Sequence, residues 1–164
     1  MRRALTDLLL LAVAAAIVAA AANFARPEPF PLAVPDGFYH MESGAKPIRM
    51  GATRRLFDAG DAVFLDARSA EVYVGGRIEG ALNLPFDEWE EALPSVEPWF
   101  DRQPVVVYAG RGEISLADDL GSVLRDHARV EKLYLYLGGF EQWRDAGLPV
   151  SDGANPIPPE ETEW

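Results

Sequence analysis

Residues 104–115 read PVVVYAGRGEIS, and this stretch combines three features that indicate a parallel α/β fold. Its first part, PVVVY, is an apolar and β-branched run, which is typical of a strand covered on both faces. Its second part, AGRGEIS, holds two glycines, which suit a tight turn after the strand. From there, residues 114–127 place a leucine at every fourth position, so we expect an amphipathic helix directly after the loop.

The same alternation of short apolar runs and helical stretches extends over residues 47–152. Further strands are expected at 62–65 and 133–137, with weaker candidates at 48–50 and 81–83. Further helices are expected at 53–59, 70–74, 88–100 and 139–146, with Thr53 and Ser69 as N-caps and a break at Pro94. Strands that alternate with helices predict an α/β fold with a mainly parallel sheet.

Composition excludes several classes of function. The chain of 164 residues suits one domain with extensions, and its net charge of −11, without a basic stripe, argues against nucleic-acid binding. It has no cysteine, which excludes disulfides, iron–sulfur clusters and cysteine catalysis. The two histidines, His40 and His127, have no neighbours at ligand spacing, so we expect neither a metal site nor a cofactor.

The N-terminus has the layout of a signal anchor or a signal peptide. Two arginines, Arg2 and Arg3, precede the apolar run LLLLAVAAAIVAAAA at residues 8–22. As a helix this run is about 22 Å long at about 1.5 Å per residue, which is short of a hydrocarbon core of about 30 Å. A membrane anchor and a cleaved signal therefore both remain open, and both place the rest of the chain outside the cytoplasmic membrane.

These observations divide the chain into four parts. Residues 1–25 are the anchor or signal, and residues 26–46 begin with the proline-rich spacer RPEPFPLAVP. Residues 47–152 form the folded domain. Residues 153–164, which contain NPIPPEETEW, are expected to be a disordered acidic tail.

Residues 64–69 read FLDARS, Glu71 and Tyr73 follow shortly after, and three further motifs lie at 76–85, 105–108 and 137–150. These five motifs resemble those of the rhodanese-like (sulfurtransferase) family. FLDARS resembles its strand-ending D-x-R-S, and Glu71 and Tyr73 follow at the spacing of its E-x-Y element. GRIEGALNLP at 76–85 resembles G-H-I-x-G-A-x-N-x-P, and the strand before the loop is similar as well. LGGFEQW and AGLPV, which follow residue 136, resemble the closing G-G-F-x-x-W…G-x-P-V. The resemblance implies a roughly five-stranded, mainly parallel sheet with helices on both faces.

The loop departs from the family pattern C-x-x-G-x-[RA]-S at the residue that carries the chemistry. Ala109 stands where the family has its cysteine, and a methyl group can neither ionise nor attack a sulfane sulfur. Gly112 and Ser115 keep their places, so the resemblance implies a candidate anion-binding loop whose backbone N–H groups converge. Glu113 would oppose an anion there. The candidate loop residues are Gly110, Arg111, Gly112, Glu113, Ile114 and Ser115.

Other parts of the expected site surround this loop. Asp66 and Arg68 end a strand where open α/β sheets place their crevice, either as part of a site or as a structural ion pair. Arg77 stands where many relatives have histidine. The alternative for the loop itself is a remnant that caps the next helix, with Ser115 at the helix start.

We therefore expect a non-enzyme: an inactive rhodanese-like domain outside the cytoplasmic membrane that binds a protein partner or a small anion. Trp89 and Trp99, beside acidic residues, are either part of a docking face or a cover for the sheet. Two further functions remain open. One is an accessory sulfurtransferase that uses a partner's thiol, and the other is a purely structural, membrane-tethered domain.

Overall fold

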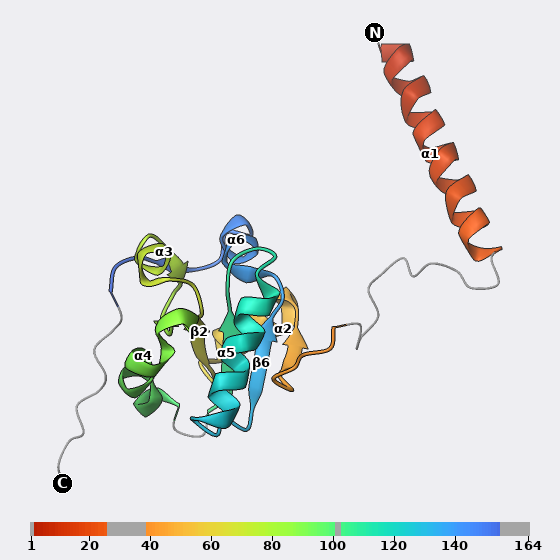
Figure 1. Cartoon of the computed structure of the whole chain (residues 1–164). Helices are drawn as coiled ribbons and strands as arrows, with labels where there is room; N and C mark the ends of the chain where they lie inside the picture. The colour runs from red at the N-terminus through yellow and green to blue at the C-terminus, as the bar shows by residue number, and fades with distance from the viewer. Residues whose placement is uncertain (1, 26–38, 101–102, 155–164) are drawn as a thin grey trace. The chain divides into compact units, whose positions relative to one another are not determined.

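A computed structural model describes residues 2–25, 39–100 and 103–154 of the chain (Figure 1). The chain divides into two compact units, residues 1–38 and residues 39–164. Most of the predicted linker (26–38) and of the predicted tail (155–164) lies outside the described residues, so these assignments stay predictions.

The described part of the first unit, residues 2–25, forms the helix α1 (Arg2–Phe24), which extends beyond the apolar run at both ends. Its segment Leu5–Asn23 has a mean hydropathy of 2.3 and is not buried. A helix of 23 residues is about 34 Å long at about 1.5 Å per residue, enough for a hydrocarbon core of about 30 Å. The helix is thus long and apolar enough to cross a membrane, and a signal sequence would have the same composition.

The second unit is built on a sheet of five parallel strands in the order β1-β6-β5-β2-β4. The strands are β1 (Lys46–Ile48), β2 (Val63–Asp66), β4 (Leu82–Asn83), β5 (Val105–Tyr108) and β6 (Leu133–Tyr136). The central strand β5 pairs with β2 on one side and with β6 on the other. This arrangement confirms the predicted α/β fold with a five-stranded parallel sheet.

Helices cover both faces of the sheet. The helices are α2 (Met50–Ala59), α3 (Ala70–Val74), α4 (Trp89–Val96), α5 (Ile114–Asp126) and α6 (Gly139–Asp145). Side chains alternate along the buried strands, so that Val105 and Val107 pack with α4 and α5, whereas Val106 and Tyr108 pack with α2 and α6. In the view of Figure 1, α5 crosses in front of the sheet.

Several local predictions were wrong. The helix predicted to start after Thr53 begins one turn earlier at Met50; Thr53 is fully buried inside it, and its hydroxyl donates to the Arg49 carbonyl at 3.1 Å. Pro94 does not break α4, because Leu93 and Val96 on either side of it are anchored in the core. The first strand ends at Ile48, where residues 48–50 were predicted, because Met50 already belongs to α2.

Three further short elements escaped prediction. β3 (Arg77–Ile78) and β7 (Val150–Ser151) form a separate antiparallel pair. The third is a short 3₁₀ turn, Phe86–Glu88, before α4, whereas a second 3₁₀ turn, Glu97–Trp99, lies within the range 88–100 that was predicted to be helical. Elements of two or three residues are too short to show a hydrophobic period, so the sequence pattern could not reveal them.

The closing motif anchors α6 against the sheet. Trp143 is fully buried, and its indole N–H donates to the Pro149 carbonyl at 2.8 Å. Its ring meets Phe57 of α2 with the ring centres 5.0 Å apart. These contacts hold the start of α6 beside the carboxyl ends of the strands, where the loop after β5 begins.

Candidate functional site

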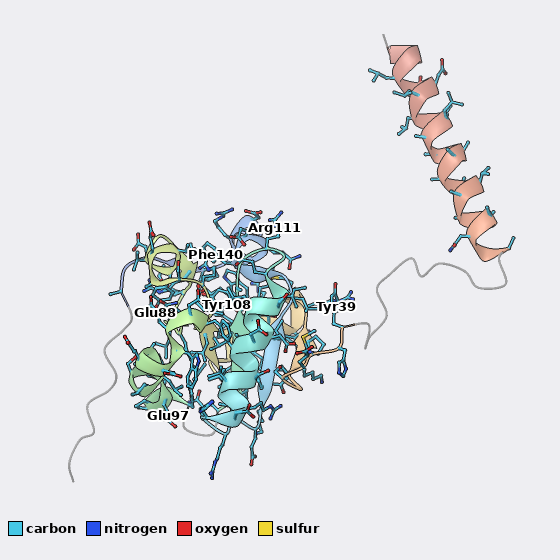
Figure 2. All side chains as sticks on the ribbon, viewed as in Figure 1. Tyr39, Glu88, Glu97, Tyr108, Arg111 and Phe140 are labelled. Atoms are coloured by element: carbon cyan, nitrogen blue, oxygen red, sulfur yellow. The ribbon has the colours of Figure 1, made fainter. Side chains whose placement is uncertain are left out.

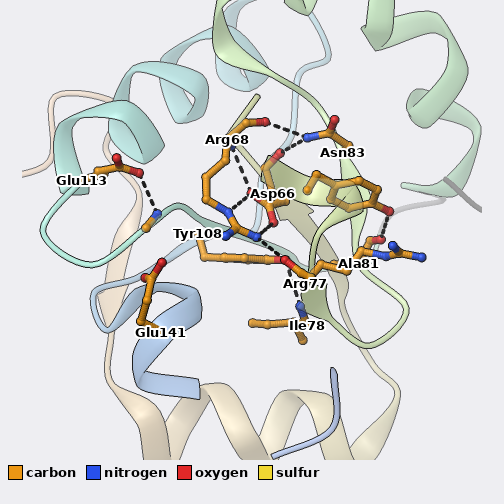
Figure 3. Close-up of polar contacts among 12 residues, drawn as sticks. Asp66, Arg68, Arg77, Ile78, Ala81, Asn83, Tyr108, Glu113 and Glu141 are labelled. Carbon is orange, nitrogen blue, oxygen red and sulfur yellow. Dashed lines mark hydrogen bonds and ion pairs between the residues drawn. The ribbon is translucent and has the colours of Figure 1, made fainter. Parts of the chain in front are cut away.

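Asp66 and Arg68 form a buried ion pair at the carboxyl end of β2 (Figure 3). The Arg68 Nε donates to Asp66 Oδ1 at 2.8 Å, and a second guanidinium nitrogen donates to Oδ2 at 2.5 Å. The backbone N–H of Arg68 also donates to Asp66 Oδ1 at 3.0 Å. Burial lowers the pKa of Arg68, but the hydrogen bond and the charge of Asp66 outweigh burial and raise it, so the guanidinium stays charged.

The same pair connects several loops. Arg68 donates to the Gly76 carbonyl at 2.8 Å, and its guanidinium lies 4.5 Å from the centre of the Phe140 ring. The amide of Asn83 donates to the backbone carbonyls of Asp66 and Arg68, at 3.0 and 2.8 Å. These contacts are those of a structural ion pair that fixes the loops after β2 and before β4.

Tyr108 ends β5 beneath this pair. Its hydroxyl oxygen accepts a hydrogen bond from the Ile78 backbone N–H at 3.1 Å. Burial, together with the neighbouring charge of Asp66, raises the pKa of Tyr108 well above its usual value of about 10. The phenol is therefore neutral, and it acts as a structural hydrogen-bonding group.

Ala109 follows directly and occupies the position of the expected nucleophile. It is only 2% exposed and packs in the core beside α5. Its backbone carbonyl accepts the N–H of Phe140 at 2.9 Å, so the start of α6 lies directly on the loop. Gly139 is required at this approach, because its φ is +66° and an added Cβ would lie 2.7 Å from the backbone of Gly110.

The loop after Ala109 is closed by two glutamates of the chain itself. Glu113 Oε2 accepts the backbone N–H of Gly110 at 2.9 Å, and the Glu113 N–H donates back to the Gly110 carbonyl at 3.2 Å. Glu141, in the first turn of α6, accepts the backbone N–H of Arg111 at 2.6 Å. Figure 3 shows both carboxylates beside the loop.

The Arg111 side chain extends away from the loop toward α6. Its guanidinium pairs with the Asp145 carboxylate at 2.5 Å, and Asp145 also pairs with Arg144. Hydrogen bonds from Arg144 and then Arg111 lower the pKa of Asp145. Arg111 and Phe140 lie at the same end of the domain (Figure 2). Arg111, which was a candidate anion ligand, is thus already paired with a carboxylate of the chain.

A pocket of about 440 Å³ lies at this end of the domain. Four of the predicted site residues line it: Arg68, Gly110, Arg111 and Glu113. It is also lined by four residues that sequence reasoning did not assign to the site: Ser69, Val72, Leu116 and Glu141. Leu116 could have been found from the sequence, as the first leucine of the helical pattern. Glu141 could not, because its contact with Arg111 joins residues thirty positions apart.

The remaining predicted residues do not line this pocket. Ser115 is the second residue of α5, and the N-cap position belongs to Glu113, so the prediction that Ser115 caps the helix was wrong. Arg77 is buried elsewhere, stacked on Tyr73 and donating to the carbonyls of Gly153 and Ala154 at 2.6 and 3.2 Å. Within residues 2–25, 39–100 and 103–154, no group of three or more acidic or histidine side chains is placed to hold a metal ion.

The two tryptophans beside the acidic residues are both half-buried and pack against the core. Trp89 lies with its ring centre 4.4 Å from that of His127. A shallow pocket of about 680 Å³ lies over residues 86–91. Both tryptophans therefore cover the sheet, which was one of the two alternatives for them.

The order of the sheet, with a glycine-rich loop between its central strand and its longest covering helix, defines a rhodanese-type α/β domain. The family model of the rhodanese-like domain matches residues 51–146, more than half of the chain. The chain belongs to the rhodanese-like domain family.

The chain is also similar to curated proteins and to solved structures. The HTH-type transcriptional regulator Rv0324 of Mycobacterium tuberculosis is 36% identical over 101 residues, which are 61% of this chain and 42% of the regulator. The thiosulfate sulfurtransferase GlpE of Actinobacillus succinogenes is 36% identical over 101 residues, 59% of this chain and 84% of GlpE. The rhodanese-like domain of the Anabaena sp. Alr3790 protein has a TM-score of 0.50 at 19% identity, over 72% of this chain and 88% of that one. This last match concerns the fold alone.

Proposed function

We propose that the chain carries a catalytically inactive rhodanese-like domain that acts as a binding or docking module. The observation that carries the proposal is Ala109, a buried methyl group at the end of β5 where the family's sulfur chemistry needs a thiolate. The chain contains no cysteine that could replace it.

The other side chains near the loop do not supply a substitute nucleophile. Ser115 lies in the first turn of α5, and His127 follows the last residue of the same helix. The two are about 18 Å apart along a helix that rises about 1.5 Å per residue, which is too far for proton transfer. His127 is also stacked against Trp89.

The second part of the proposal is that the domain lies outside the cytoplasmic membrane, and it is based on the N-terminal helix α1. Its apolar segment Leu5–Asn23 crosses the cytoplasmic membrane once, and Arg2 and Arg3 keep its start inside. The domain then lies in the periplasm or outside the cell, held at the membrane or released by cleavage of the helix as a signal.

The partner is a protein that docks over the pocket beside the loop. Val72 forms one wall of this pocket and is 49% exposed. With a net charge of −11, the chain favours a neutral or basic partner.

Site-specific photo-crosslinking of the full chain in its native membrane tests this proposal. A photoreactive residue at Val72 should give a defined crosslinked partner, whereas one at Val150, which is 45% exposed and lies outside the pocket, should not. Equal products from both positions would contradict docking at the pocket. Sulfur transfer by the crosslinked pair, but not by either protein alone, would instead favour the accessory-enzyme alternative.

A further inference from the structure

The loop between β5 and α5 satisfies two of its backbone N–H groups with carboxylates of the chain itself. The Gly110 N–H donates to Glu113 at 2.9 Å, and the Arg111 N–H donates to Glu141 at 2.6 Å. Both glutamates line the pocket. A negative group thus already occupies the place from which an external anion would approach these donors.

We propose that Glu113 is an internal ligand of this loop and determines its specificity by excluding small oxyanions from the pocket. An incoming oxyanion would have to displace Glu113 from the Gly110 N–H. It would also come close to the negative charge of Glu141, which is unfavourable.

The two nearby cations do not compensate for this charge. The Arg68 guanidinium is bonded twice to Asp66 and once to a backbone carbonyl. The Arg111 guanidinium is paired with Asp145. The four charges of these two pairs cancel. Arg144, which also pairs with Asp145, offsets only one further negative charge, so the carboxylates of Glu113 and Glu141 together keep the potential at the loop negative.

The same contact gives a physical reason why the loop keeps its turn with alanine at position 109. The hydrogen bonds between Gly110 and Glu113 run in both directions and close the four-residue turn before α5. Glu113 lies so close that a Cβ on Gly110 would be 2.6 Å from its Oε2. This inference goes beyond the proposed function, because a domain without catalysis can still bind an anion.

In the test, thiosulfate is titrated into the full chain in detergent micelles. Its binding is followed by the NMR signals of the loop's backbone amides and by calorimetry. The variants are Glu113→Ala, which removes the internal ligand, and Glu71→Ala, which removes an exposed charge beside Val72 without freeing a loop N–H. The native chain and Glu71→Ala should bind thiosulfate equally weakly. Glu113→Ala should bind thiosulfate about tenfold or more tightly, because the freed N–H can then form a hydrogen bond to a charged group, which usually contributes this much to affinity.

Two results would overturn the proposal. One is equal affinity of the native chain and Glu113→Ala for thiosulfate. The other is an equal gain of affinity in Glu71→Ala, which would indicate an effect of net charge alone.

If Glu113→Ala does not fold, Glu113→Gln decides, because it removes the charge and keeps an acceptor oxygen. It should still bind more tightly than the native chain, and an unchanged affinity would refute the role of the carboxylate. Sulfur transfer by the native chain would instead count against the proposed function, so the two failures are distinguishable.

Discussion

The carboxylate of Glu113 and the backbone N–H of Gly110 are 2.9 Å apart, and this contact closes the loop that leads from β5 into α5. In rhodanese-like domains with a cysteine, this loop faces a sulfur anion. Here Ala109 stands at the position of that cysteine, and the loop N–H of Gly110 faces the carboxylate of Glu113. Two of the loop's backbone N–H groups, those of Gly110 and Arg111, are thus bonded to carboxylates of the chain itself.

Removing one member of the buried ion pair should destabilise the domain strongly. Asp66→Ala leaves the Arg68 guanidinium buried without its carboxylate, so we expect a loss of about 3–5 kcal/mol in the free energy of unfolding. Urea denaturation of the full chain in detergent, followed by tryptophan fluorescence, measures it. The matched control is Asp58→Ala, because Asp58 pairs with Arg54 on the surface and should contribute less than about 0.5 kcal/mol. Similar losses in the two variants would contradict the structural role assigned to Asp66.

Gly139 should tolerate no side chain, for two separable reasons. Gly139→Ala both strains a positive φ and forces a methyl group against the backbone of Gly110. Gly147→Ala has the same positive φ but open space around its Cβ. We expect about 1–2 kcal/mol of destabilisation at Gly147, from φ alone, and clearly more at Gly139. The two variants are compared by their midpoints of thermal unfolding. An equal decrease of the midpoint in both would show that the close contact between α6 and the loop does not matter for stability.

Stability should fall at alkaline pH because buried tyrosines must stay neutral. Burial raises the pKa of Tyr136, and likewise of Tyr73, to about 12, and raises that of Tyr108 as well. A folded-state pKa above the unfolded value of about 10 contributes stability that is complete below pH 10 and is lost as the pH rises through the folded pKa. The free energy of unfolding should therefore decrease between about pH 10 and 12.

Tyr136→Phe checks the source of this alkaline effect. The variant lacks one of the shifted phenols, so its stability should fall less steeply with pH than that of the native chain. Near neutral pH the two should differ only by a roughly constant amount, since Tyr136 donates one hydrogen bond to Gln142 there. Parallel curves up to about pH 12 would show that Tyr136 does not contribute to the alkaline loss.

The sequence predicted the three central strands β2, β5 and β6 well, because they are largely buried and appear as continuous apolar runs, whereas the edge strands β1 and β4 were only weak candidates. Asp66 and Arg68 could also be placed, since they end a strand two positions apart. Glu113 was recognised as opposing an anion, but its reach back to Gly110 depends on the turn at Gly112, which has φ +84°. Glu141 could not be found, because its contact with the loop exists only once α6 is packed on β5.

Helix starts were the weaker part of the prediction for a similar reason. Thr53 and Ser115 are good N-cap residue types, but neither caps a helix, because packing of Met50 and the turn at Glu113 decide where α2 and α5 begin. Ser69 does occupy the N-cap position of α3, although its side chain makes no capping hydrogen bond. Capping preferences of about 1 kcal/mol are small enough for tertiary contacts to override.

The most direct test of the inactive-domain proposal is sulfur transfer from thiosulfate to cyanide by the purified native full chain in detergent micelles, with thiocyanate as the product measured. We expect a rate equal to that of the reaction without protein, because no side chain of the loop can carry a sulfane sulfur. Thiocyanate formation that is proportional to protein concentration, and lost when Arg68 is replaced, would contradict the inactive-domain proposal and show that the domain is an enzyme.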